Sequence, residues 1–202
     1  MKTYKVVRKQ TENFYNKFSF LYPLADIFLG AHKRVLSREI NKLPFGELLE
    51  IGVGNGKHLP MYKTHKITGI DTSLNMIKIA RAQSFEHIEL LQMDGEALLF
   101  SDQSFDYVVL CHVIAVVDNA ETLLTEAYRV LKPNGQLFIL NHFTPNTWLR
   151  FVDYAAQLVS RMLHFKSVFF INHLTNIKKF NLLKEISLGR FAYFKLLIYS
   201  RT

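Results

Sequence analysis

The sequence has little cysteine, no zinc-type spacing of ligands and no long hydrophobic run. Its 202 residues include a single cysteine, Cys111, so no disulfide can form within the chain. No set of Cys and His residues has the spacing of a zinc site, and we expect no metal. The longest apolar stretch, residues 107–117, contains His112 and is shorter than the ~20 residues that span a bilayer. These absences argue against a disulfide-rich secreted domain, a zinc module and a membrane-spanning helix.

The amino terminus lacks the apolar core of a signal peptide. Its first ten residues contain Lys2, Lys5, Arg8 and Lys9. Together with the lone cysteine, this favours a cytoplasmic location. The composition, with 49% apolar and 13% aromatic residues, excludes a disordered chain. A chain of this length is most simply one α/β domain with a substantial core.

The net charge of +8 is concentrated at the two ends of the chain. Residues 1–44 hold nine basic and three acidic residues, residues 45–144 hold seven and twelve, and residues 145–202 hold nine and two. Both ends are also rich in aromatic residues. This distribution indicates that the ends meet one anionic partner, either a membrane surface or nucleic acid.

The basic amino-terminal region has the pattern of two helices. Apolar residues recur at spacings of three and four through residues 3–22, and Pro23 is expected to end that helix. A second helix is expected from Leu24 to about Asn41. Two interpretations stay open: the helices pack over the edge of a sheet, or the first lies on an anionic membrane with its lysines towards the phosphates.

Three glycines at alternate positions follow the first predicted strand. Residues 45–51 read as this strand, and Gly52, Gly54 and Gly56 come directly after it. Residues 57–62 then resemble the start of a short helix, so the segment predicts a cradle for a nucleotide-type ligand. It is not a dinucleotide fingerprint, because Lys57 stands where the last glycine would be, and no Gly-Lys-Ser/Thr phosphate loop is present.

An acidic residue ends the second predicted strand, residues 66–71. Asp71 lies about twenty residues beyond the glycine turn, where a carboxylate of a doubly wound sheet accepts hydrogen bonds from ribose hydroxyls. Further strands are expected at residues 89–93, 104–111 and 136–141, and Thr72-Ser73 and Asp118 are expected to begin the helices between them. Residues 132–135 read as a turn, residues 145–163 as an aromatic-rich helix, and residues 182–187 and 191–199 as an antiparallel pair.

These motifs together resemble those of the class I S-adenosylmethionine-dependent methyltransferases. The resemblance implies a Rossmann-like, doubly wound α/β fold with a seven-stranded sheet, preceded by an amino-terminal helical lid. Residues 1–44 are then the lid or membrane contact, and residues 45–202 the domain that binds S-adenosyl-L-methionine. The residues that the resemblance assigns to this cofactor are Glu50, Gly52, Gly54, Gly56, Asp71, Thr72, Met76, Asp94, Gly95 and Cys111.

Two further pieces resemble the small soluble bacterial phosphatidylethanolamine N-methyltransferases. They are the glycine turn running into Leu59-Pro60-Met61-Tyr62, and Asn141-His142-Phe143 after the fifth strand. The resemblance implies stepwise methylation of a lipid amine at the inner face of a membrane, with the enzyme peripherally bound. The residues expected to serve the methyl acceptor are His142, Tyr15, Tyr22 and His112.

Other functions stay open at this point. A quinone precursor or another lipophilic small molecule is an alternative acceptor, and a nonenzymatic cofactor-binding protein is a third possibility. Methylation of nucleobase amino groups is not expected, because Cys111-His112 stands where such enzymes carry an Asp/Asn-Pro-Pro-aromatic sequence. Each histidine has a plainer interpretation as a hydrogen-bonded residue of the site wall.

Overall fold

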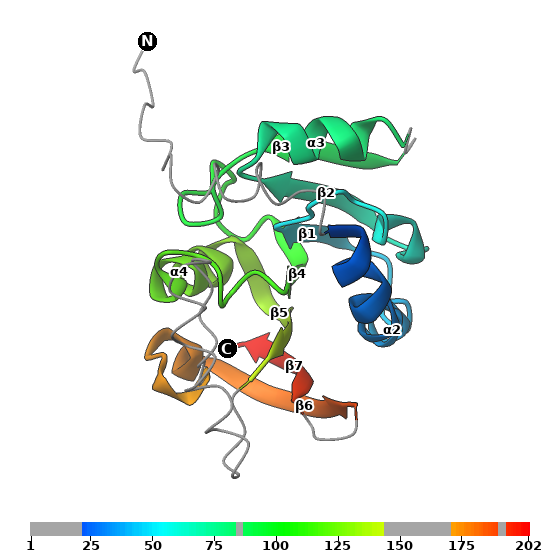
Figure 1. The fold of residues 1–202 in the computed structure, drawn as a ribbon. Helices are drawn as coiled ribbons and strands as arrows, with labels where there is room; N and C mark the ends of the chain where they lie inside the picture. Colours follow the sequence, from blue (N-terminus) through cyan, green and yellow to red (C-terminus); the bar gives the residue numbers. More distant parts are fainter. Residues whose placement is uncertain (1–21, 84–86, 144–170, 190–192) are drawn as a thin grey trace.

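A seven-stranded sheet with helices on both faces forms the centre of the computed structural model (Figure 1). The structure describes residues 22–83, 87–143, 171–189 and 193–202. The strands are β1 (Glu47–Ile51), β2 (Lys66–Asp71), β3 (Ile88–Gln92), β4 (Phe105–Cys111), β5 (Leu131–His142), β6 (Phe180–Leu188) and β7 (Phe194–Arg201). The helices are α2 (Tyr22–Ile40), α3 (Leu74–Arg81) and α4 (Ala120–Val130), with single 3₁₀ turns η2 (Leu59–Met61), η3 (Ile171–His173) and η4 (Asn176–Lys179).

The strand order is β3-β2-β1-β4-β5-β7-β6. The first five of these run parallel to one another, and β7 runs antiparallel to both β5 and β6. The order reverses between β1 and β4, which is where doubly wound sheets bind ligands. The predicted fold class, including the antiparallel pair at one edge, is confirmed.

Two hydrophobic cores cover the two faces of the sheet. On one face, buried residues of α4 such as Leu123 and Leu124 pack against inward residues of the strands. On the other face, Leu36 of α2 and Ile77 of α3 do the same. Strands buried on both sides are expected to be apolar throughout, and β4 is buried at nearly every position. The cores therefore hold the parallel strands rigidly and leave their carboxyl ends to build a site.

Register brings several predicted site residues to one edge of the sheet. Ile51 pairs with Ile70 of β2 and with Leu110 of β4, and Cys111 pairs with Leu140 of β5. The glycine turn after β1, Asp71, Cys111 and His142 consequently lie along the same carboxyl edge. This is the geometric basis of the candidate site.

Some local predictions need correction. The segment after the glycine turn is the single 3₁₀ turn η2 rather than the start of an α-helix. Asn119 rather than Asp118 caps α4, since its side chain accepts hydrogen bonds from Glu121 N and Thr122 N. Pro23 lies inside the first turn of α2, where a missing N–H costs no helical hydrogen bond.

The predicted turn at residues 132–135 lies inside β5 as an irregularity. Leu131 already pairs with Phe105, and the pairing then jumps to Gln136 opposite Tyr107. Asn134 has a positive φ of 62°, which suits asparagine better than most residues. The strand therefore starts earlier than expected. The predicted helices at residues 3–22 and 145–163 lie outside the described residues.

Candidate functional site

The glycine turn bends sharply back against β2. Gly52, Gly54 and Gly56 all have positive φ, at 78°, 56° and 71°. The N–H groups of Gly52 and Val53 both donate to the carbonyl of Ile70, at 2.8 and 3.0 Å. A side chain at Gly52 would also meet Val113, 2.8 Å from the ideal Cβ position. Only glycine fits this backbone without strain, so the turn exposes bare peptide at the carboxyl edge.

Asp71 joins the glycine turn to the end of β2. Its Oδ2 accepts a hydrogen bond from Gly54 N at 2.9 Å, and its Oδ1 accepts one from Ser73 N at 2.8 Å. Burial raises the pKa of this carboxyl, while the two backbone N–H groups act in the opposite direction. Each carboxylate oxygen has two lone pairs, so both oxygens keep the capacity to accept a ribose hydroxyl. The residue types and their geometry fit the ribose of the expected cofactor.

Four other predicted cofactor residues occupy different environments along the same edge. Thr72 is exposed, and Met76 is buried in the first turn of α3, where its N–H donates to the capping Ser73 Oγ at 3.3 Å. Cys111 is buried at the end of β4. Gly95 is buried so tightly that an added Cβ would lie 2.5 Å from Ile51 Cγ2.

The turn containing Asp94 is bound to helix α4. Asp94 is exposed, and its Oδ1 accepts from Glu96 N at 2.9 Å within the turn. Glu96 in turn accepts from the N–H groups of Asp118 and Asn119, at 3.0 and 3.1 Å, just before α4 begins. Asp94 therefore stands on a fixed loop with an exposed carboxylate, as an adenine-binding residue would require.

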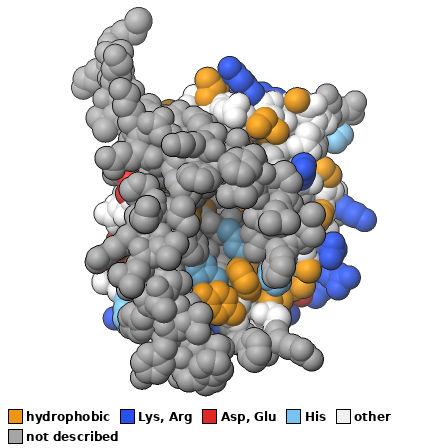
Figure 2. Space-filling model, in the orientation of Figure 1, with side chains coloured by type: hydrophobic (Ala, Val, Ile, Leu, Met, Phe, Trp, Pro, Cys, Tyr) orange, Lys and Arg blue, Asp and Glu red, His pale blue; other side chains and the backbone are white. Residues whose placement is uncertain are grey.

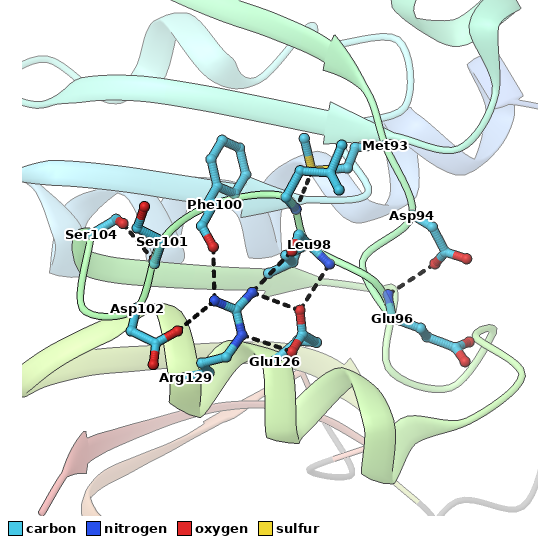
Figure 3. Close-up of polar contacts among 11 residues, drawn as sticks. Met93, Asp94, Glu96, Leu98, Phe100, Ser101, Asp102, Ser104, Glu126 and Arg129 are labelled. Carbon is cyan, nitrogen blue, oxygen red and sulfur yellow. Dashed lines mark hydrogen bonds and ion pairs between the residues drawn. The ribbon is translucent and has the colours of Figure 1, made fainter. Parts of the chain in front are cut away.

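Arg129 secures the rest of this loop from the other end of α4 (Figure 3). Its guanidinium donates to the carbonyls of Leu98 and Phe100, at 3.0 and 2.7 Å, and forms ion pairs at 2.8 Å with Asp102 and Glu126. These carboxylates raise the pKa of Arg129, which stays charged. A planar guanidinium suits several acceptors at once, so one side chain fixes the whole segment.

Glu50 lies beneath the glycine turn rather than on its surface. The side chain is fully buried, and its Oε1 is 2.6 Å from Nε2 of the buried His58. Tyr62 belongs to the same group, because burial and then the negative charge of Glu50 raise the pKa of its hydroxyl. The expected role of Glu50 at the cofactor remains a prediction. Sequence analysis did not identify His58 and Tyr62 as neighbours of Glu50, although both follow the glycine turn directly in the chain.

The acceptor-side histidines gather on aromatic side chains. His142, at the end of β5, stacks on Tyr193 with 5.8 Å between ring centroids. His112 has a φ of 59° directly after β4, and its ring centroid lies 5.8 Å from that of Phe194. His32 of α2 lies 4.5 Å from the same Phe194 ring. The structure thus brings together two predicted histidines and one that sequence analysis missed, since nothing around His32 in the chain distinguishes it.

Two predicted acceptor residues lie wholly or partly outside the described residues. Tyr15 lies outside the described residues. Tyr22 begins α2, but its side chain is outside the described part of the structure. Their roles stay predictions.

Across residues 22–83, 87–143, 171–189 and 193–202, no group of three or more His, Cys, Asp or Glu side chains is arranged to hold a metal ion. In the same ranges no helix is both long and apolar enough to cross a bilayer.

A family model matches the part of the chain that carries the cofactor motifs, and one relative is similar over most of the chain. Residues 49–139 match the model of a methyltransferase domain. A phosphatidylethanolamine N-methyltransferase of Cereibacter sphaeroides is 33% identical over 164 residues, covering 77% of this chain and 80% of the relative. A demethylmenaquinone methyltransferase of Listeria monocytogenes is 39% identical over 84 residues, covering 40% of this chain and 35% of that protein.

Solved structures agree on the fold. A SAM-dependent methyltransferase of Thermotoga maritima superposes with a TM-score of 0.70 at 22% identity, covering 96% of this chain and all of that one. The class I fold implies use of S-adenosylmethionine, and the glycine turn with Asp71 has the geometry to hold it. The chain belongs to the class I S-adenosylmethionine-dependent methyltransferases.

Proposed function

We propose that the chain methylates the amino head group of phosphatidylethanolamine, stepwise towards phosphatidylcholine, at a membrane surface. The observation that carries this proposal is the extent of the similarity to the Cereibacter enzyme, which reaches 77% of the chain. The demethylmenaquinone relative matches 40% of the chain. Because the cofactor motifs are shared among many methyltransferases, similarity beyond them is what bears on the acceptor.

The cofactor is held between the glycine turn and the Asp94 turn. Asp71 accepts from the ribose hydroxyls, Gly52 and Gly54 let the backbone approach, and Asp94 accepts from the adenine amino group. Gly56, Thr72, Met76, Gly95 and Cys111 complete the predicted set around them. When bound, S-adenosylmethionine supplies an electrophilic methyl group on a sulfonium with a neutral thioether leaving group.

The acceptor residues have to orient an amine and remove its proton. His142 lies at the carboxyl end of β5, held by Tyr193, and in this proposal takes the proton from the amine. Tyr15 and Tyr22 present aromatic faces and hydroxyls to the methylated ammonium. A cation–π interaction with one well-placed face contributes about 0.5–2 kcal/mol. Alignment and exclusion of water supply the remaining catalysis, since methyl transfer needs no covalent intermediate.

The basic ends of the chain provide the membrane contact in this proposal. Residues 1–44 carry nine basic and three acidic residues, and a basic residue near an anionic leaflet contributes about 1 kcal/mol. The protein is then a peripheral protein on the cytoplasmic face of the membrane. Nucleic acid is not the proposed partner.

A second candidate acceptor is a quinone precursor, methylated on carbon or oxygen. It is supported by the 39% identity to the Listeria demethylmenaquinone methyltransferase, although that match covers 35% of the relative.

One experiment separates the two candidate acceptors. The purified protein is supplied with labelled methyl donor and with phosphatidylethanolamine vesicles and a quinone precursor together. We expect label in mono-, di- and trimethylated lipids from phosphatidylethanolamine vesicles. Label in the quinone alone would replace the first candidate by the second, and label in neither would refute both.

A further inference from the structure

Phe194 is the centre of a cluster built from four separate elements. It begins β7 and pairs with His142 of β5 in the sheet, with 6.4 Å between the ring centroids. His112, after β4, and His32 of α2 lie against the same ring, with 5.8 and 4.5 Å between the ring centroids. Figure 2 shows histidine atoms next to hydrophobic side chains near the middle of this face. Three imidazoles thus surround one aromatic ring at the carboxyl edge.

Two of these imidazoles carry buried nitrogens that have no hydrogen-bond partner among the described residues. They are Nε2 of His112 and Nδ1 of His32. Buried polar atoms are nearly always paired, so each such atom calls for a ligand or an explanation. His112 is also held in a left-handed backbone conformation, with its N–H bonded to the carbonyl of Leu140 at 2.7 Å. Strain of this kind concentrates at functional sites.

Burial and nearby basic groups act on the His112 imidazole. Burial, followed by Lys33, His32, His142 and His58, lowers the pKa of His112 to about 3. The imidazole is therefore uncharged at neutral pH and too weak a base to hold the proton of an amine. A neutral imidazole still donates a hydrogen bond in its Nε2–H tautomer. Such a donor suits an acceptor oxygen, such as that of a phosphodiester or a phenolate, and not an ammonium group, which has only N–H donors.

We propose that His112 and His32 form an oxyanion-binding pocket against Phe194, which holds the phosphodiester of the acceptor. The identity of the acceptor rests on the proposed function, whereas anion binding itself does not. In phosphatidylethanolamine two carbons separate the phosphodiester from the amine. Fixing the phosphodiester near His112 therefore keeps the amine within reach of His142, which contacts the same ring. A phenolate of a quinone precursor offers the same anionic oxygen, and the test below separates the sources.

The test follows imidazole signals by NMR of the full-length protein during titration with glycerophosphoethanolamine. We expect the His112 and His32 signals to shift and the affinity to fall at least tenfold in His112→Asn and in His32→Phe. Asparagine tolerates the left-handed conformation at residue 112, and phenylalanine keeps an aromatic ring against Phe194 at residue 32. The exposed His87 is the matched control, and His87→Gln should bind like the wild type.

Further probes identify the source of the anion. If inorganic phosphate or a dihydroxyphenol shifts the signals of the same two histidines, the oxyanion pocket is also supported. The probe that does so identifies the source of the bound oxygen as free phosphate or a quinone precursor. Two results would overturn the oxyanion pocket. One is an affinity for choline, which has no phosphate, equal to that for glycerophosphoethanolamine. The other is a titration in which the His112 and His32 signals do not move. Phosphodiester binding without any transfer to phosphatidylethanolamine would refute the proposed function and leave the pocket standing.

Discussion

The carboxylate of Glu50 and the imidazole of His58 lie 2.6 Å apart, and both side chains are buried beneath the glycine turn. The pair connects Glu50, near the end of β1, to His58, the residue just before η2. It fixes the two ends of the glycine turn to one another, so that the turn keeps its shape before any ligand arrives.

Removing one partner of this pair should destabilise the fold. His58→Ala leaves the Glu50 carboxylate buried without its partner, which costs about 3–5 kcal/mol for comparable buried pairs. Urea denaturation followed by circular dichroism measures this cost. The exposed His87→Ala should change stability by less than about 0.5 kcal/mol. Equal stability of the two variants would show that the pair contributes nothing.

The cofactor assignment predicts loss of binding with retention of fold. Asp71→Ala removes the acceptor for the ribose, and Gly54→Val places a branched side chain at a φ of 56°. Calorimetry with S-adenosylmethionine should detect no binding in either variant, while cooperative unfolding persists. Glu89→Ala, at an exposed position of β3, is the control. Wild-type affinity in the Asp71 variant would refute the assignment.

The membrane proposal predicts salt-dependent binding to anionic vesicles. Deleting residues 1–12 removes four of the basic residues and should weaken co-sedimentation while sparing cofactor affinity. Raising salt should release the intact protein. Equal sedimentation with neutral vesicles, or no effect of the deletion, would instead mean that these residues serve the fold.

The acceptor residues should affect turnover rather than cofactor binding. Tyr15→Ala and His142→Ala are each expected to lower kcat/KM roughly tenfold to a thousandfold, or about 1.4–4 kcal/mol of transition-state stabilisation. Tyr15→Phe retains activity if the ring face matters and loses it if the hydroxyl does. Assays use phosphatidylethanolamine vesicles and saturating methyl donor. Full activity in both alanine variants would place the acceptor elsewhere.

His112 should make the protein sensitive to mild acid. Its pKa is about 3 in the folded state and about 6.5 in the unfolded chain, so the unfolded state binds more protons between these values. The stabilisation is therefore complete above pH 6.5 and is lost as the pH falls towards 3. Between pH 7 and pH 5 the wild type should lose about 2 kcal/mol more than His112→Asn in urea denaturation. Parallel losses in both proteins would contradict the lowered pKa.

Much of the fold was predictable because its signals are local. The apolar strands, the glycines after β1 and the acidic end of β2 lie in short stretches, and a parallel sheet then aligns their carboxyl ends. The errors also have local causes. Asn119 and Asp118 are equally good caps by type, and the chain geometry selects the former. The glycine turn is followed by the single 3₁₀ turn η2 where the start of a short helix was expected.

The histidine cluster was only partly predictable, because it depends on contacts between distant elements. His112 and His142 were identified from their positions after strands. His32 joins them only because α2 packs on the face of the sheet that carries Phe194. Similarly, Glu50 was noticed as part of a motif, whereas its contact with His58 follows from the bend of the glycine turn.

The Asp94 turn is attached to both ends of α4, through Glu96 at the start and Arg129 at the end. Since α4 itself is buried against the sheet, this wall of the site cannot swing outward without breaking an ion-pair network and exposing a core. Fluctuations that admit and release a ligand must therefore arise on other sides of the site. Product exchange and the rigidity of the adenine side are, in this architecture, assigned to different parts of the molecule.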